Sequence, residues 1–253
     1  MAKRKNIRTA GRLMTGVVYT VPSRGDTEQQ RSAKTQVSTL GREKMNMKYS
    51  WQKMEWLVAA NFDYQDLMLT LTYRDDCRPE KRSEAVKRFR KWIKGVRDLR
   101  RQTGEATLYV YCTEGLHGDH KLHHHVIINC HADSVQTLID LWPHGNVDYE
   151  PIGVMGYTKL AQYLTKEPRE QGHWNVGERT WIPSLGLYRP KPETGFCPDN
   201  YTLTPPPGAH VLFSDSVRNE WGEFTYLKCI LPEQPPDLPQ RYHRPPRKSA
   251  AKT

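Results

Sequence analysis

The sequence has no long hydrophobic run, and this absence excludes one class of protein. A helix that spans a bilayer needs about 20 consecutive apolar residues. No stretch of the chain approaches that length, and nothing in it resembles a signal peptide. We therefore expect a cytoplasmic protein without a membrane partner.

Cysteine is also scarce, and a phosphate-binding loop is missing. The five cysteines are scattered, odd in number and never spaced as Cys-x-x-Cys. This pattern argues against a disulfide framework and a structural zinc site, and it fits a reducing compartment. Gly11 and Gly16 have the spacing of a nucleotide-binding loop, but Val17 stands where the loop requires lysine. The chain also has no internal repeat.

Positive charge, in contrast, is abundant. The chain carries 38 Lys and Arg residues against 28 Asp and Glu residues, which gives a formal net charge of +10. Such an excess favours a polyanionic partner, either nucleic acid or an anionic membrane surface. Because no membrane-spanning segment is present, we infer a nucleic-acid partner.

Hydrophobic periodicity predicts an α+β fold, an antiparallel sheet with helices packed on one face. Strands are expected at residues 67–73, 107–113, 122–129 and 146–149. Helices are expected to end near Asn61, to begin at Pro79, and to cover residues 132–141 and 156–167. A further hairpin is expected between residues 211–213 and 224–230. This order of elements predicts a site on the open face of the sheet.

The stretch 121–129 carries the main candidate site. Side chains alternate on a strand, so His123 and His125 share one face while His124 points to the other. Glu114 ends the preceding strand and would lie beside the pair if the two strands are antiparallel neighbours. Two imidazoles and a carboxylate form an open metal site, a ligand set also found in non-haem iron oxygenases and zinc hydrolases. The alternative is a set of packed core histidines or a solvated loop.

A tyrosine on the helix at 156–167 is the candidate nucleophile. Tyr163 stands one turn from both Lys159 and Lys166, whereas Tyr157 falls on the packing side. A phenol with a pKa near 10 attacks poorly unless nearby positive charge stabilises it. With these lysines and a cation on the substrate phosphate, the natural reaction is transesterification of a DNA phosphodiester. The alternative is an ordinary amphipathic tyrosine.

The helix that begins near Pro79 is amphipathic. Its apolar stripe runs through Val86, Phe89, Ile93, Val96 and Leu99, and its basic face includes Arg88 and Lys91. That basic face either contacts DNA or is simply solvated.

Together these motifs resemble the HUH endonucleases, specifically the rolling-circle replication initiators (Rep) of small bacterial plasmids and phages related to the filamentous-phage gene II protein. The motifs are Leu69–Tyr73, His123–His125 with its hydrophobic continuation, and Tyr163–Lys166. Their order makes the resemblance specific, and it covers roughly residues 60–170.

The resemblance implies a Mn²⁺- or Mg²⁺-dependent nickase that cuts single-stranded DNA at a replication origin in a bacterial cell or phage-infected host. His123, His125 and Glu114 would hold the metal, and Tyr163 would attack and stay linked to the 5′ phosphate. Lys166 would position or neutralise the phosphate. Lys159, Arg88 and Lys91 are the expected DNA contacts. A host helicase and polymerase are the implied partners.

The same reading divides the chain into four segments. These are a basic tail (residues 1–6) followed by a helical segment (1–60 in all), a nuclease domain (61–170), a loop and hairpin extension (171–231), and a disordered, basic, proline-rich tail (232–253).

Three alternatives stay open from the sequence. A relaxase or single-strand transposase shares the same chemistry and differs in biological context. A non-haem iron oxygenase shares the ligand set but needs neither the tyrosine helix nor the basic charge. A non-catalytic DNA-binding protein would retain DNA without cleaving it.

Overall fold

The computed structural model describes residues 2–21, 39–115, 121–130, 135–153, 155–165, 179–220 and 222–233. They group into two compact units. The first unit draws on Met1–Asn61, Val154–Gln162 and Arg189–Leu238, and the second on Phe62–Gly153 and Tyr163–Tyr188. Each unit therefore joins segments that are distant in the sequence. The four-segment division stays a prediction, since its boundary at residues 170 and 171 and residues 234–253 lie outside the described residues.

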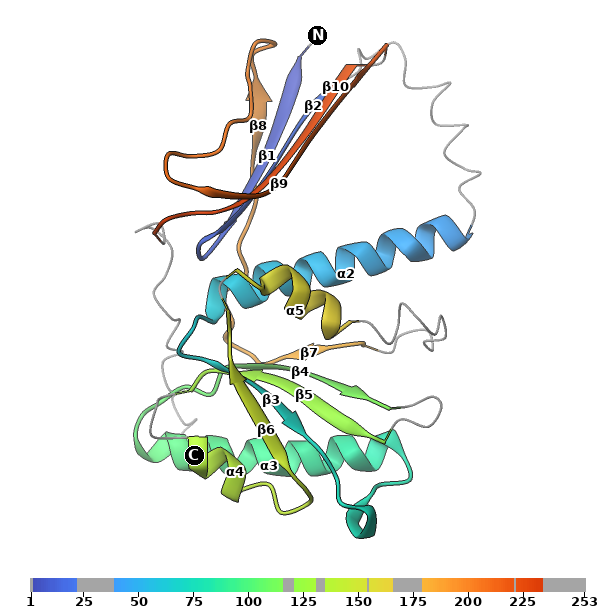
Figure 1. Ribbon diagram of the computed structural model, residues 1–253, viewed down its shortest axis with the longest axis vertical. Coiled ribbons are helices and arrows are strands. Elements are labelled where there is room, and N and C mark those ends of the chain that lie inside the picture. Colours follow the sequence, from blue (N-terminus) through green and yellow to red (C-terminus); the bar gives the residue numbers. More distant parts are fainter. Residues whose placement is uncertain are drawn as a thin grey trace, which may run out of the picture. The chain divides into compact units, whose positions relative to one another are not determined.

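The second unit is built on a five-stranded antiparallel sheet (Figure 1). Its strand order is β6 (Val147–Pro151), β3 (Leu67–Leu71), β5 (His123–Ile128), β4 (Tyr109–Glu114) and β7 (Ile182–Pro183). The central strands are rich in β-branched, aromatic and leucine residues, which suit a sheet covered on a face. The α+β fold class is confirmed, and the strands expected at residues 67–73, 107–113, 122–129 and 146–149 are all present within a few residues.

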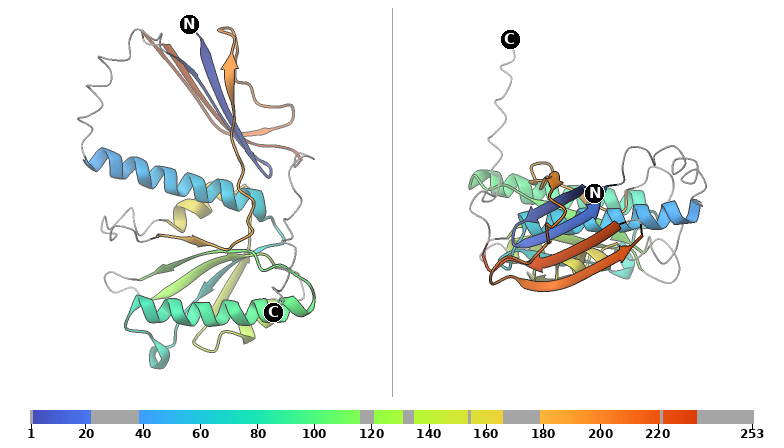
Figure 2. Two further views of the ribbon diagram at one scale, coloured as in Figure 1. Left: turned by 180° about the vertical axis from the view of Figure 1, so that it is seen from behind. Right: turned by 90° about the horizontal axis from the view of Figure 1, so that it is seen from above.

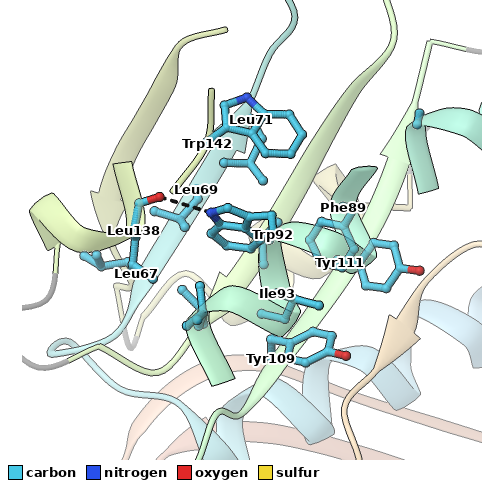
Figure 3. Packing of buried hydrophobic residues seen from close by; sticks show 14 of the residues in the cluster. Leu67, Leu69, Leu71, Phe89, Trp92, Ile93, Tyr109, Tyr111, Leu138 and Trp142 are labelled. Atoms are coloured by element: carbon cyan, nitrogen blue, oxygen red, sulfur yellow. Dashed lines mark hydrogen bonds between the residues drawn. The ribbon is translucent and has the colours of Figure 1, made fainter. Parts of the chain in front are cut away.

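Two helices, α3 (Arg82–Gln102) and α4 (Val135–Asp140), pack on one face of this sheet (Figure 1; Figure 2, left). Every second residue of β3 faces them, because strand side chains alternate. The core between the layers includes Leu69, Phe89, Trp92 and Tyr111, and the Trp92 Nε1 atom donates a hydrogen bond to the Leu138 carbonyl at 3.1 Å (Figure 3). The opposite face of the sheet carries the candidate site.

Helix α3 differs from its expected form at both ends. It begins at Arg82 rather than Pro79, and Leu99, expected on the apolar stripe, is 40% exposed. Arg100 is buried in its place, because its guanidinium donates hydrogen bonds to the side-chain and main-chain oxygens of Asn129 at 2.8 and 2.7 Å. Asn129 also accepts a hydrogen bond from the Leu108 amide at 2.8 Å. This network joins the end of α3 to the neighbouring ends of β4 and β5.

The first unit holds a second five-stranded antiparallel sheet (Figure 2, right). Its order is β8 (Glu193–Cys197), β1 (Lys3–Ala10), β2 (Leu13–Thr20), β10 (Gly222–Ile230) and β9 (His210–Asn219). The unit also contains α2 (Thr39–Asn61), which ends where the sequence predicted, and α5 (Tyr157–Tyr163), whose last residue counts with the second unit. The expected hairpin is confirmed as β9 and β10.

The basic tail predicted for residues 1–6 is wrong. These residues begin β1, which pairs with β2 on one side and β8 on the other. Lys3 and Lys5 form ion pairs with Glu223 at 3.0 Å and Glu193 at 2.6 Å. The positive charges at the start of the chain are therefore used within the sheet.

Two further findings bear on the sequence analysis. None of the five cysteines, all of which are described, forms a disulfide. Among the described residues, no helix combines the length and the apolar character needed to cross a membrane.

Candidate metal centre and adjoining tyrosine

The pairing of β4 with β5 brings the three candidate ligands together. Glu114 lies directly opposite His123 in the antiparallel register, and His125 follows two residues later on the same face. Glu114 and His125 are 4% and 2% exposed, and His123 is partly exposed. The cluster therefore has two buried members and one member reachable from solvent.

The distances within this triad suit one cation. The His123 and His125 Nε2 atoms lie 3.1 Å apart, and they lie 3.7 and 3.6 Å from the Glu114 Oε2 atom. Two atoms bonded to one metal at about 2.1 Å are separated by at most about 4.2 Å. All three separations meet this limit, so the residues present fit a divalent cation without rearrangement of the backbone.

Hydrogen bonds at the far side of each ring orient the imidazoles. The His123 Nδ1 atom lies 2.9 Å from the Lys121 carbonyl oxygen, which only accepts, so Nδ1 is the protonated nitrogen. The His125 Nδ1 atom lies 3.1 Å from the Thr70 hydroxyl of β3. Partners of this kind turn the Nε2 atoms toward the ligand position, as in many metal sites.

Gly115 shapes the backbone next to the triad. Its φ of +93° is in the region that favours glycine, and a Cβ there would stand 2.6 Å from the Lys121 carbonyl oxygen. That oxygen is the acceptor for His123. The glycine thus permits the close approach that fixes the first histidine.

His124 has a structural environment on the opposite face, as the alternation predicted. It is fully buried, and its two ring nitrogens contact the Thr113 hydroxyl at 2.9 Å and the Tyr73 hydroxyl at 2.8 Å. Its ring also contacts Phe89 and Trp142. Burial lowers the pKa of His124 to about 3, and the neighbouring histidines add to this effect. His124 is therefore a neutral core residue.

Tyr163, the last residue of α5, lies beside the triad. Its ring centroid is 5.0 Å from that of His125, in an edge-on arrangement, and the residue is 43% exposed. Tyr157 at the other end of the helix is 3% exposed. A solvent-accessible phenol next to a metal-ligand set can reach a phosphate held there, whereas the buried tyrosine lacks this access.

The other predicted site residues are not all placed with the triad. Lys166 lies outside the described residues. Lys159 is exposed on α5 in the first unit. Arg88 and Lys91 belong to α3, on the face of the sheet opposite the triad. Arg88 binds Glu84 at 2.5 Å and also the Cys77 carbonyl, whereas Lys91 is exposed.

Sequence reasoning missed the groups that orient the ligands. Thr70 was seen as part of a strand motif, but its role follows only from its register opposite His125. The alternation of β3 already places Thr70 on the open face with Met68, which was an available signal. The Lys121 carbonyl is a main-chain group and left no mark in the pattern.

Comparison with known families points in one direction. Residues 66–168 match the family model of the replication-associated proteins ORF2 and gene II protein. This range contains β3, the triad and Tyr163. No curated protein and no solved structure gives a significant match to the chain. The match supports a Rep-like replication-initiator family.

Proposed function

We propose that the protein initiates rolling-circle replication by nicking and rejoining single-stranded DNA at an origin, as an HUH endonuclease. The reaction passes through a covalent 5′-phosphotyrosine on Tyr163. The work takes place in the cytoplasm of a bacterial cell or phage-infected host, where a host helicase and polymerase supply unwinding and synthesis.

One observation carries the proposal, the position of an exposed Tyr163 beside the His125 ring of a His-His-Glu triad. The match to a replication-associated family over these same residues supports it. The net charge of +10 also suits a DNA substrate. An iron oxygenase has no need for the phenol at this position.

His123, His125 and Glu114 would hold the Mn²⁺ or Mg²⁺ ion, which when bound neutralises charge on the scissile phosphate. Lys121 and Thr70 keep the two imidazoles aimed at that position. Burial of Glu114 and His125 limits water around the ligands, which strengthens electrostatic interactions there.

Tyr163 supplies the nucleophile. Its Oη atom attacks phosphorus, the Oη–P bond forms and the P–O3′ bond breaks. The phenol loses its proton, and the 3′ oxygen leaves as a hydroxyl that primes synthesis. The phosphotyrosine ester retains the energy of the broken bond, so the reverse reaction rejoins DNA without a nucleotide. Lys166 would neutralise the phosphate, and Lys159 would contact DNA nearby.

The test is a covalent-adduct assay with single-stranded DNA from the protein's own replicon and Mn²⁺, resolved on denaturing gels. The wild-type protein should give a protein–DNA band that a chelator abolishes. Tyr163→Phe should give none, because the ring remains but the nucleophilic oxygen is lost. Tyr157→Phe is the matched control and should retain the band.

Other outcomes are equally informative. Adduct formation by Tyr163→Phe but not by Tyr157→Phe would move the nucleophile to Tyr157. Cleavage without any adduct would indicate attack by water. If DNA is bound but never cut in any origin-region strand, the protein is a DNA-binding factor and the nickase proposal is wrong.

A further inference from the structure

A recess separate from the triad opens in the second unit, beside the N-terminal half of α3, the end of β4 and the start of β7. Its volume is about 530 Å³, within the range of small-ligand sites. Four cationic side chains line it: Arg82, Lys87, Arg90 and Arg179. The lining, which consists of described residues, includes no carboxylate. We call this recess the basic pocket.

The wall of the basic pocket combines hydrogen-bond donors with an aromatic surface. The Tyr111 ring stacks on Phe89 with centroids 3.9 Å apart, and its hydroxyl is directed away from the core residues (Figure 3). Val86 and Ile182 add apolar surface, and Ser83 and Thr180 add hydroxyl groups. Arginine, lysine and hydroxyl donors together suit phosphate oxygens, and the apolar wall suits a sugar or base.

The basic pocket lies close to the triad along β4. Cys112 and Thr113 line it, and the next residue is the triad's Glu114. The Cys112 thiol donates toward the Glu114 Oε1 atom at 3.7 Å, and Thr113 contacts His124 at 2.9 Å. One strand end therefore contributes to both places. A DNA strand held at the triad has neighbouring nucleotides within reach of this pocket.

We propose that the basic pocket binds a phosphodiester-linked nucleotide of single-stranded DNA, next to the nucleotide that reacts at the triad. The inference rests on the proposed function for its partner. Four cations exceed the charge of a single phosphodiester, so they suit successive phosphates of a strand better than an isolated nucleotide. The volume accommodates one nucleotide, with its sugar or base against the apolar wall.

The test measures binding alone, without cleavage. A 5′-fluorescein-labelled dT12 strand is titrated with the full chain in EDTA, and anisotropy is followed at several salt concentrations. The pocket variant is Lys87→Gln/Arg179→Gln, because both side chains are exposed and their loss leaves the core intact. The control is Lys94→Gln/Arg101→Gln, which removes two exposed charges of α3 that do not line the pocket.

The pocket variant should bind dT12 about tenfold or more weakly than the control at the same salt. Its slope of log affinity against log salt should fall by up to about 1.4, since each lost contact to a single strand removes about 0.7. Lys87→Arg/Arg179→Lys should restore both values. Thermal melting of each variant checks that the fold is retained.

Equal affinity and slope in the two double variants would overturn the proposal. So would displacement of dT12 by equimolar dTMP, because the pocket would then take free mononucleotides. The outcome is independent of the nickase reaction, since EDTA prevents any metal-dependent step. A protein that forms no adduct but shows the predicted pocket effect would refute the nickase and leave strand binding at the pocket standing.

Discussion

The Nε2 atoms of His123 and His125 lie 3.1 Å apart, while the Nδ1 atom of His123 is held by the Lys121 carbonyl. The fixed His123 tautomer presents an Nε2 lone pair to its neighbour. His125 can satisfy that lone pair by donating from Nε2, or can join it in binding a cation. Thr70, whose hydroxyl both donates and accepts, supports His125 in either tautomer.

Metal binding should therefore stabilise the fold. A cation that binds only the folded protein adds about 2.7 kcal/mol at 100 times its Kd. Thermal melting with and without Mn²⁺ should show a rise in Tm for the wild type and for His210→Ala, an exposed histidine on β9. His125→Ala should show no rise. An equal rise in His125→Ala would place the ion elsewhere.

The orientation of His125 by Thr70 gives a second prediction. Thr70→Val removes the hydroxyl but keeps the shape of the side chain. Loss of a group that orients a ligand typically weakens metal binding about 10–100-fold. Isothermal titration with Mn²⁺ should show this weakening. Thr72→Val, on the same β3 segment but bonded to the Asn146 carbonyl, is the control. Unchanged affinity in Thr70→Val would remove Thr70 from the site.

The two faces of β5 predict opposite effects for adjacent histidines. His124→Ala opens a cavity among Phe89, Tyr73 and Trp142 and removes two hydrogen-bond partners, so it should cost about 3 kcal/mol. It should still show the Mn²⁺-induced rise in stability. Denaturant unfolding with and without Mn²⁺ measures both quantities. Loss of the metal effect with little loss of stability would mean that His124 belongs to the metal centre.

The nuclease-like half of the chain was predictable because its signals are local. The alternation of β3, β4 and β5 is visible in each segment, and β4 and β5 are joined by a short connection. Their antiparallel pairing places Glu114 opposite His123, so the triad follows from period two and chain proximity.

The rest depends on partners far away in the sequence. Strand β1 begins Lys-Arg-Lys-Asn and reads as a solvated tail, but Lys5 is paired with Glu193, 188 residues away. Arg100 is buried because Asn129 accepts its hydrogen bonds, and no helical periodicity can indicate that acceptor. Non-local pairing of this kind outweighs local propensity.

A buried ion pair in the first unit should be sensitive to the loss of one partner. Glu55 of α2 and Lys228 of β10 form a salt bridge, and both are almost fully buried. Thr158 donates to Glu55 and accepts a hydrogen bond from Lys228 at 2.7 Å. Glu55→Gln leaves a buried ammonium without its counter-charge and should cost about 3–5 kcal/mol.

Replacing both partners separates charge from packing. Glu55→Leu/Lys228→Met should recover most of that loss, because a well-packed apolar pair often replaces a buried ion pair at little cost. Denaturant unfolding of the single and double variants completes the cycle. A double variant as unstable as Glu55→Gln would mean that the site depends on hydrogen bonding through Thr158 rather than on charge balance.

The ion pair that ties the start of the chain to its sheet predicts a pH effect with a definite sign. The Lys3 ammonium hydrogen-bonds the Glu223 carboxylate at 3.0 Å, and this bond and charge lower the pKa of Glu223 below its ordinary value. The pair therefore adds stability above the pKa of an unfolded glutamate, about 4.3. That contribution is lost as pH falls through the lower, folded-state value.

Carbon-detected NMR titration of the Glu223 carboxyl should give a midpoint below that of an unperturbed glutamate. Lys3→Gln should raise this midpoint, and so should added salt, because both partners are near the surface and screening weakens their attraction. Arg4→Gln, on the opposite face of β1, should leave the midpoint in place. An ordinary midpoint in the wild type would mean that residues 3–10 do not hold the β1 pairing in solution, and the predicted basic tail would then return.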